Sequence, residues 1–446
     1  MKMTYNEYKD SGIEWIGEIP SHWYVCKLKH TCDRITDGSH SSPSTTDVGK
    51  PYITVSDVRD GAIDVENSHR ISLQDFGKLV SSGCQPRVGD VLLAKDGTVG
   101  RTAIVSENDF VVLSSLGIIS PQNKITSKFL KYSLDSSLLQ EQMNMAMAGS
   151  ALRRITIEKI KELLVIIPPL DEQQAIASYL DEKCEKIDTL VNELEKQIED
   201  LGQLKKSEIS RVVTKGLNPN APLKDSGIEW IGQTPEGWTT HRLKHEFSMG
   251  KGLPITKDDL KDTGLPVVSY GQIHAKSNSG LIIAQELIRF VDKSFLNSNT
   301  QSIVPKGGFI FADTSEDVEG SGNCIYQDRD ETIFAGYHTI ILFPRKNFNN
   351  KYLAYLFQEN SWRSQIRSRV YGTKVMSITK AILEECTIIS PPPDEQRSIV
   401  SYLDTFCAKI DATTSEIEKQ IEDLKAYKQS VISEAVTGKI RVTEQN

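Results

Sequence analysis

The amino-acid sequence contains two copies of one frame, and this internal repeat limits the possible folds more than any other feature. The nonapeptide KDSGIEWIG occurs at 9–17 and again at 224–232. A later match joins PPLDEQQAIASYLD at 168–181 to PPPDEQRSIVSYLD at 391–404. Because similarity at a nearly constant offset marks a repeated structural unit, we expect two halves with the same architecture.

The segments between the shared blocks differ in sequence. They span roughly 31–154 and 246–377, and the second is eight residues longer because the offset between the copies rises from 215 to 223. The motifs GDVL at 89–92 and GFIF at 308–311 still keep the two segments in register. One fold with two different surfaces is the economical interpretation, and a duplication that drifted without functional divergence is the alternative.

A long helix is expected in each copy. Asp171 and Glu172 follow a Pro-Pro pair, where the positive end of a helix dipole favours carboxylates. Downstream, around the repeated EKQIEDL, apolar positions recur at spacings of 4, 3, 4 and 3, which is the seam of a coiled coil. The seam residues are Ile187, Val191, Leu194, Ile198 and Leu201 in the first copy and Ile410, Thr414, Ile417, Ile421 and Leu424 in the second. Two such units related by an approximate twofold axis would pair their helices antiparallel. Helices that each pack back on their own domain are the alternative.

The differing segments are predicted to mix helices and strands. Short apolar runs at 52–55, 90–94 and 339–343 predict strands separated by Asp-Gly turns, and helical stretches are expected at 128–147 and 351–370. The predicted fold class is α+β, with two domains of similar fold joined by two long helices that form an antiparallel coiled coil with an internal pseudo-twofold repeat. The expected domains are 1–154 and 218–377, and the expected repeated regions with a long helix are 155–217 and 378–446.

Composition and missing motifs exclude several classes of function. The formal net charge is −8, so no global positive field indicates nucleic acid, but the long helical regions hold an excess of acidic residues and the charge says little about the domains. The seven cysteines are scattered without a CxxC pair, which argues against a disulfide framework or a zinc site. No phosphate loop, adenine-methylation motif or HExxH is present, so we expect no catalytic residue and no metal site in this chain. No signal peptide or membrane span is expected, and the cytoplasm is the expected location.

Taken together, the duplicated opening, the PPxDEQ helix start, the EKQIEDL coil and the two dissimilar segments resemble the specificity subunit of bacterial type I restriction-modification systems. The resemblance covers nearly the whole chain. It implies that about 18–154 and 233–377 are target recognition domains, each of which reads one half of a split, asymmetric site in double-stranded DNA. The helices would set the gap between the half-sites.

The same resemblance implies the partners and the cofactors. The repeated helices would dock two methyltransferase subunits, and two ATP-dependent restriction and translocase subunits would complete the complex. S-adenosylmethionine, ATP and magnesium would then belong to the partner subunits, with no cofactor in this chain and no membrane partner.

The expected DNA contacts lie in loops and in one basic helix. A segment at 37–40 and a glycine-rich loop at 95–101 resemble recognition loops of the family, and Arg363 and Arg367 share a helical face at a spacing that suits adjacent phosphates. Structural turns and a solvated helix face are the alternatives. The first loop is altered to MGKG at 249–252 in the second copy, and the second loop becomes acidic at 313–317. The candidate residues are Ser39, His40, Lys95, Thr98, Arg101, Ser150, Arg153 and Arg154 in the first domain and Lys251, Arg363, Arg367, Arg369, Tyr371, Thr373 and Lys374 in the second.

Two other classes of function stay open at this point. A coiled-coil protein-interaction scaffold would show no sequence-specific DNA binding, and an unrecognised enzyme would show turnover by the chain alone. The duplicated frame around two divergent domains favours the DNA-reading subunit, because an asymmetric two-part site needs one scaffold and two different readers.

Overall fold

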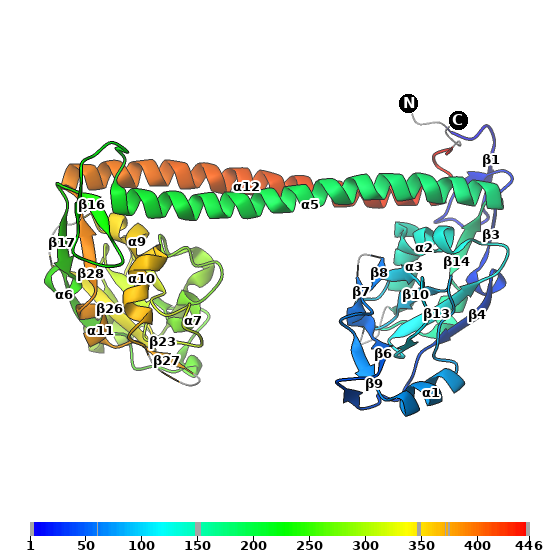
Figure 1. The fold of residues 1–446 in the computed structure, drawn as a ribbon, viewed down its shortest axis with the longest axis horizontal. Coiled ribbons are helices and arrows are strands. Elements are labelled where there is room, and N and C mark those ends of the chain that lie inside the picture. Colours follow the sequence, from blue (N-terminus) through cyan, green and yellow to red (C-terminus); the bar gives the residue numbers. More distant parts are fainter. Residues whose placement is uncertain are drawn as a thin grey trace. The chain divides into compact units, whose positions relative to one another are not determined.

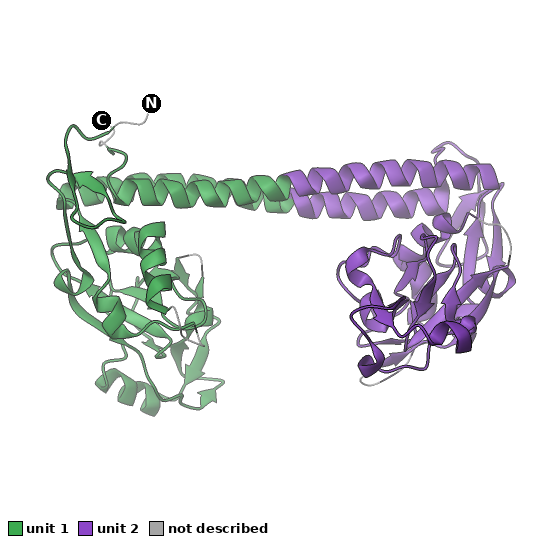
Figure 2. Cartoon of the chain, turned by 180° about the vertical axis from the view of Figure 1, so that it is seen from behind, with its two compact units in different colours: residues 1–196, 417–446 green, residues 197–416 purple. Residues whose placement is uncertain are grey.

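The computed structural model describes residues 4–59, 61–147, 153–345, 349–370, 372 and 375–442. The chain divides into two compact units (Figure 2). Unit 1 consists of Met1–Lys196 and Ile417–Asn446, and unit 2 consists of Gln197–Glu416. Each unit therefore holds one mixed domain together with a part of each long helix.

Unit 1 is built around two four-stranded sheets. One sheet has the antiparallel order β11-β10-β13-β4, and the other has the order β12-β6-β9-β5, in which β12 and β6 are parallel. Its strands are β1 Tyr8–Asp10, β2 Glu18–Pro20, β3 Tyr24–Lys27, β4 Cys32–Asp37, β5 Thr45–Thr46, β6 Lys50–Ile53, β7 Val58–Arg59, β8 Ala62–Ile63, β9 His69–Ile71, β10 Val91–Ala94, β11 Thr102–Ile104, β12 Val111–Val112, β13 Leu116–Pro121 and β14 Leu164–Ile167. Its shorter helices are α1 Leu73–Ser81, α2 Ser127–Asp135, α3 Ser137–Met147 and α4 Ile157–Lys161.

Unit 2 repeats this plan. Its sheets have the orders β18-β26-β22-β24 and β20-β19-β25-β21, and β19 and β25 form the parallel pair. Its strands are β15 Leu223–Asp225, β16 Gln233–Pro235, β17 Thr239–Arg242, β18 Phe247–Lys251, β19 Leu265–Val268, β20 Arg289–Val291, β21 Ile303–Val304, β22 Phe309–Ala312, β23 Thr314–Ser315, β24 Cys324–Tyr326, β25 Ile333–Ala335, β26 Thr339–Pro344, β27 Met376–Ser377 and β28 Thr387–Ser390. Its shorter helices are α6 Leu243–Glu246, α7 Tyr270–Ile273, α8 Phe295–Ser298, α9 Asn350–Gln358, α10 Asn360–Arg367 and α11 Lys380–Glu384.

The central strands β10 and β22 are apolar throughout because both of their faces are covered. In β10, Val91 and Leu93 point into one core, whereas Leu92 and Ala94 point into a second core on the other face. Strand β22 divides its side chains in the same alternation. Successive side chains of a strand point to opposite faces, so this arrangement requires an unbroken apolar run. The predicted α+β fold with two similar domains is confirmed.

Two helices predicted as continuous are each broken once. The predicted helix 128–147 is interrupted at Ser136, and the predicted helix 351–370 is interrupted at Glu359, where the backbone is extended in both cases. The Ser136 hydroxyl donates to Ser133 O at 2.5 Å. A side chain that bonds its own backbone in this way competes with the helical ladder. The breaks turn α2 and α3, and α9 and α10, into separate helices that cover the sheet on the side of α5 and α12 (Figure 1).

The long helices α5 Leu170–Lys215 and α12 Pro393–Val436 contribute to both units. Within unit 1, Lys428 Nζ lies 2.6 Å from Asp188 and Lys425 Nζ lies 3.5 Å from Glu195. The residue number falls along α12 as it rises along α5, so the two segments are antiparallel. Within unit 2, the ion pair between Lys205 and Asp411 at 2.6 Å precedes a 2.7 Å hydrogen bond from Tyr402 to Glu208, which gives the same direction.

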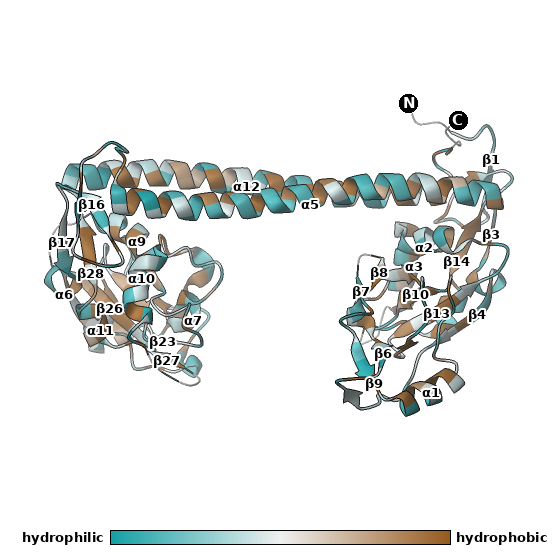
Figure 3. Cartoon of the chain, viewed as in Figure 1, coloured by the Kyte–Doolittle hydropathy of each residue, from teal (hydrophilic) through white to brown (hydrophobic). Residues whose placement is uncertain are grey.

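The predicted coiled-coil seam is confirmed by burial. Every seam position is buried or half-buried, in contrast to the exposed positions between them. The buried members are Ile187, Val191, Ile410, Ile417 and Ile421, and the half-buried members are Leu194, Ile198, Leu201, Thr414 and Leu424. Figure 3 shows the apolar residues concentrated in the sheets and only interspersed along α5 and α12. In the described part of the chain, no helix is long and apolar enough to cross a membrane.

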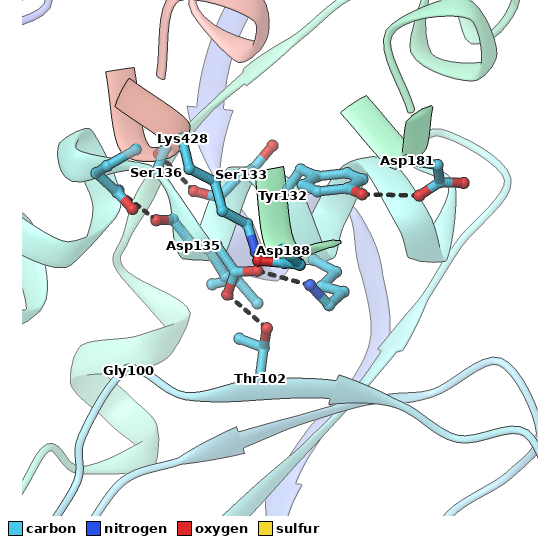
Figure 4. A network of polar contacts seen from close by, with 12 residues as sticks. Gly100, Thr102, Tyr132, Ser133, Asp135, Ser136, Asp181, Asp188 and Lys428 are labelled. Atoms are coloured by element: carbon cyan, nitrogen blue, oxygen red, sulfur yellow. Dashed lines mark hydrogen bonds and ion pairs between the residues drawn. The ribbon is translucent and has the colours of Figure 1, made fainter. Parts of the chain in front are cut away.

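Each unit fixes its domain to the long helices through the same residues. In unit 1, Tyr132 Oη donates to Asp181 on α5 at 2.7 Å (Figure 4). Lys128 pairs with the same carboxylate at 2.5 Å. Burial raises the pKa of Tyr132, and the hydrogen bond to Asp181 raises it further. Unit 2 repeats the contact 223 residues later, where Tyr355 Oη donates to Asp404 at 2.6 Å. Each domain is therefore fixed to a long helix by the same tyrosine–aspartate contact.

Candidate nucleic-acid interface

A loop follows the central strand of each domain, and both loops are fastened by backbone hydrogen bonds. In unit 1 the β10–β11 loop, residues 95–101, begins at Lys95, whose N–H donates to Ser115 O at 2.9 Å and whose carbonyl accepts from Ile155 N. In unit 2 the β22–β24 loop, residues 313–323, begins at Asp313, whose N–H donates to His338 O at 3.1 Å. The carbonyl of Asp313 accepts from Ile378 N, as that of Lys95 does from Ile155. Lys95 and Asp313 therefore occupy equivalent positions, as do Ser115 and His338.

The two loops differ in length. Ala94 N donates to Arg101 O at 2.8 Å at the end of the β10–β11 loop, and Ala312 N donates to Asn323 O at 3.2 Å at the end of the β22–β24 loop. The offset between the domains is thus 218 at the first residue of the loop, Lys95 or Asp313, and 222 at its last residue, Arg101 or Asn323. The β22–β24 loop is therefore four residues longer.

Lys95 is buried, which corrects the expectation of an accessible DNA contact. Its side chain is 2% exposed, and Nζ lies 3.2 Å from Asp37 Oδ2 at the end of β4. The same carboxylate oxygen lies 3.2 Å from His40 Nε2, and the His40 ring is 69% exposed. An ammonium group in this position neutralises a carboxylate that is itself largely shielded from water. Of the three residues, His40 is the one that faces solvent.

Ser39 is also buried, because the chain after β4 runs tightly against β12. A Cβ on Gly38 would lie 2.0 Å from Val112 O, and Ser39 N donates to that same oxygen at 2.8 Å. The Ser39 hydroxyl is used within its own turn, where it donates to Ser41 O at 2.6 Å. Ser39 therefore stabilises the turn instead of presenting a hydroxyl to a ligand.

The counterpart of this turn in unit 2 begins two residues later than the sequence indicated, at Lys251 instead of Met249. Gly252 N donates to Thr339 O, as Gly38 N does to Leu116 O, and a Cβ on Gly252 would meet Gly336 O at 1.9 Å. Lys251 therefore stands where unit 1 has Asp37. Lys251 is exposed and forms no ion pair with any described residue.

The remaining candidates of unit 1 lie at the surface of the β10–β11 loop and beside it. Thr98 and Arg101 are exposed, and Arg101 forms no ion pair within the described chain. Arg154 Nε pairs with Asp96 Oδ1 at 3.0 Å, and Arg153 donates to Asn144 at 3.4 Å. Ser150 lies outside the described residues. Thr98 and the three arginines stay predicted DNA contacts.

The two arginines of α10, which were predicted to contact phosphates with a solvated helix face as the alternative, hold the β22–β24 loop. Arg363 donates to Asn323 Oδ1, to Gln358 Oε1 at 2.5 Å and to Phe357 O at 2.7 Å. Burial lowers the pKa of Arg363. Arg367 donates to Glu319 O at 2.6 Å, and its Nε is buried without a partner.

The face of α10 that carries Arg363 and Arg367 is thus turned towards the loop. Arg369 is exposed and, like Lys251, stays a predicted DNA contact. The other three candidates of the second domain, Tyr371, Thr373 and Lys374, lie outside the described residues.

Sequence reasoning missed an aromatic group at the start of β26. His338 has φ 55° and Nδ1 3.2 Å from Asp313 Oδ1, and its ring lies 5.5 Å from that of Tyr270 and 6.0 Å from that of Tyr337. The residue equivalent to His338 in the first domain is Ser115, so comparison of the two copies did not single out this histidine. The one available hint was the Gly-Tyr-His run directly before a predicted strand.

The described residues contain no group of three or more histidine, cysteine, aspartate or glutamate side chains that could hold a metal ion. The polar groups that the two loops bring together are donors, acceptors and single charges at the surface. Such an arrangement suits recognition of a polymer with phosphates and base edges better than covalent chemistry.

Known proteins resemble the chain over both halves. The family model described as the type I restriction modification DNA specificity domain matches residues 20–200 and 235–423. The type I restriction enzyme MjaVIII specificity subunit of Methanocaldococcus jannaschii is 23% identical over 403 residues, which are 89% of this chain and 87% of that protein. The EcoKI specificity subunit of Escherichia coli is 27% identical over 213 residues, 47% of this chain and 44% of that protein.

Solved structures share the fold. A chain from a solved type I restriction-modification system superposes with a TM-score of 0.69 and 19% identity over 95% of this chain and 99% of that one. The HsdS subunit of Thermoanaerobacter tengcongensis superposes with a TM-score of 0.51 and 18% identity over 95% and 98%. Since the family model covers most of both repeats, and since each repeat has folded into the same domain plan, this chain belongs to the type I restriction modification DNA specificity domain family.

Proposed function

We propose that this chain is the non-catalytic DNA-reading subunit of a type I restriction-modification complex, in which each domain reads one half of a two-part, asymmetric DNA site. The family supports this role, as does the presence of two unlike polar surfaces on one repeated fold. Phosphate contacts position a protein on DNA, whereas different base sequences require different donors and acceptors at the base edges.

One observation carries the proposal. At equivalent positions the first domain has Asp37 and Lys95, whereas the second has Lys251 and Asp313, so the signs of the two charges are exchanged. The loop that follows is also four residues longer in the second domain. The strand order of the sheet around β10 or β22 and the tyrosine contact to the long helix, by contrast, are the same in both domains. Unlike polar surfaces on one shared frame suit two readers of unlike half-sites.

The long helices are proposed to set the gap between the half-sites and to dock the partner subunits. Helix α5 has 46 residues, and at 1.5 Å per residue it is about 69 Å long, roughly twice the ~34 Å of one turn of DNA. Two methyltransferase subunits and two ATP-dependent restriction subunits are the proposed partners. S-adenosylmethionine, ATP and magnesium would serve those subunits, and the cytoplasm is the proposed location. The alternative of a protein-interaction scaffold has only the coiled coil in its favour.

The test is a methylation map. The chain and its methyltransferase subunit are expressed together in a host without other adenine methylation, and modified bases are mapped by sequencing, with the methyltransferase subunit alone as the control. One new two-part motif that requires this chain is the expected result. If no motif appears and the co-purified complex binds a random pool of duplexes without enriching any sequence, the scaffold alternative is correct instead.

A further inference from the structure

We propose that His338 reads a base edge in the half-site of the second domain, with Asp313 as the residue that positions its ring. This inference rests on the proposed function, because it names the specificity-determining residue of one of the two readers. His338 directly precedes β26, and its side chain lies beside Asp313, Tyr270 and Tyr337.

The backbone of His338 is held in a conformation that side chains other than glycine seldom adopt. Its φ is 55°, and every other positive φ in the described part of the chain belongs to a glycine. The strand that follows and the hydrogen bond from Asp313 N to His338 O fix this conformation. Strained residues of this kind persist where the surrounding structure over-determines them, and they cluster at functional sites.

The imidazole is exposed but does not move freely. Its side chain is 57% exposed, and Nδ1 lies 3.2 Å from Asp313 Oδ1, so Asp313 is attached to His338 through both backbone and side chain. A carboxylate that accepts the Nδ1 proton leaves Nε2 as the ring atom that is open to a ligand. Nε2 has no hydrogen bond or ion pair with any described residue.

The chemistry of that open nitrogen matches a base edge. In a ring protonated at Nδ1, Nε2 is an acceptor, and the major groove offers amino donors at adenine N6 and cytosine N4. The rings of Tyr270 and Tyr337 flank the imidazole with centroids 5.5 and 6.0 Å away, and neither hydroxyl has a hydrogen-bond partner among the described residues. The exposed Lys251, on the strand next to β26, supplies a cation for a neighbouring phosphate.

A second network fixes Asp313 from behind. His274 Nε2 lies 2.8 Å from Thr314 O, the residue next to Asp313, and His274 Nδ1 lies 3.1 Å from Asn323 Nδ2. Asn323 in turn accepts from Arg363. Through Asn323 and His274, the half-buried Arg363 thus ties the end of the longer loop to the backbone next to Asp313.

The first domain contains the same device built from other positions. There His40 Nε2 lies 3.2 Å from Asp37, and the acid comes from the end of β4 instead of the loop after the central strand. A carboxylate-held, exposed imidazole thus stands at the corresponding end of each domain, with the opposite ring nitrogen engaged.

The experiment uses the full chain in complex with its methyltransferase subunits. His338→Asn removes the imidazole, and asparagine tolerates positive φ, so the fold is kept. His245→Asn, an exposed histidine of α6 without a described partner, is the matched control. Methylation rates are measured on duplexes in which each base pair of both half-sites is changed in turn. The expected result is that His338→Asn lowers the preference at one base pair of the second domain's half-site about 10-fold, or shifts it to another base. The other half-site, the gap and the control stay unchanged.

Two further variants keep the test sharp. His338→Gly removes all side-chain chemistry at no steric cost and should lose the same preference. For Asp313, the amide of Asp313→Asn still offers an acceptor, so that variant should retain most of the preference, while Asp313→Leu should lose it at the same base pair with an unchanged melting temperature. Unchanged preference at every base pair in both His338 variants refutes the inference, provided the wild-type complex shows a two-part site. If the wild type shows none, it is the proposed function that fails.

Discussion

Replacing Lys95 by methionine should destabilise unit 1, because it leaves Asp37 without its main counter-charge. Lys95 is 2% exposed and the Asp37 side chain is 19% exposed, so both charges are largely removed from water. Removing one partner of a buried pair costs roughly 3–5 kcal/mol. Asp37 keeps some solvent and the contact to His40, and we therefore expect the lower end, about 3 kcal/mol.

Removing both charges should restore most of this loss. In the double variant Lys95→Met with Asp37→Leu no unpaired charge stays buried, and apolar replacement of a buried pair is often neutral. Each single variant should cost about 3 kcal/mol and the double variant less than about 1 kcal/mol, a coupling that a double-mutant cycle measures directly.

Hydrogen exchange is the assay, because the two units need not unfold together. Amides of β10 and β13, which flank Lys95, should exchange faster by a factor of roughly 100 in Lys95→Met, since 1.4 kcal/mol corresponds to a factor of ten. Peptides of β22 and β26 in unit 2 serve as the internal reference. A Lys95→Met variant with unchanged exchange, or a double variant as destabilised as the single one, would refute the buried-pair reasoning.

Three further predictions concern the surface, the helices and acid stability. Arg101→Ala should weaken DNA binding by the complex and reduce the slope of log K against log salt by about 1, whereas Lys95→Met should leave the slope unchanged, as salt titrations will show. Deleting one EKQIEDL heptad from α5, at 195–201, together with its partner heptad in α12, should change the gap between half-sites but neither half-sequence in a methylation map. Glu162 accepts from Lys27 and Lys29, which lower its pKa to about 2, so its ion pairs stabilise the fold above pH 4.5 and lose this effect as the pH falls towards 2. Glu162→Gln should therefore narrow the stability difference between pH 5 and pH 2 in urea titrations.

The sequence predicted the features that depend on repeated spacing. The seam of α5 and α12 follows from apolar residues at 4, 3, 4 and 3, because that spacing alone places them on one helix face. The strand β10 follows in the same way from the short apolar run at 90–94. These features depend on many residues at once, so a change at one position does not hide them.

The polar ends of the domains were less predictable, because there single contacts decide the outcome. Lysine is usually a surface residue, and the burial of Lys95 depends on its ion pair with Asp37. Asp37 is 58 positions earlier, and its strand β4 lies beside β10 only because both pair with β13. Arg363 and Arg367 have the correct spacing for one helix face, but the spacing does not say whether a loop lies over that face. The longer β22–β24 loop, with four extra residues, covers it. The backbone conformation of His338 has no sequence signal, since its equivalent is a serine.

The way in which the loops are fastened explains how the two domains can carry such different polar groups at equivalent places of one fold. The first residue of each loop is held by its own N–H and C=O, through Ser115 and Ile155 in unit 1 and through His338 and Ile378 in unit 2. Backbone groups are the same for every residue except proline, so lysine and aspartate fit the same place without a change in the strands. Charges of opposite sign at equivalent positions are then compatible with one fold. A reader built in this way can change its side chains at the loop ends while β10 or β22, the covering helices and the contact to α5 stay as they are.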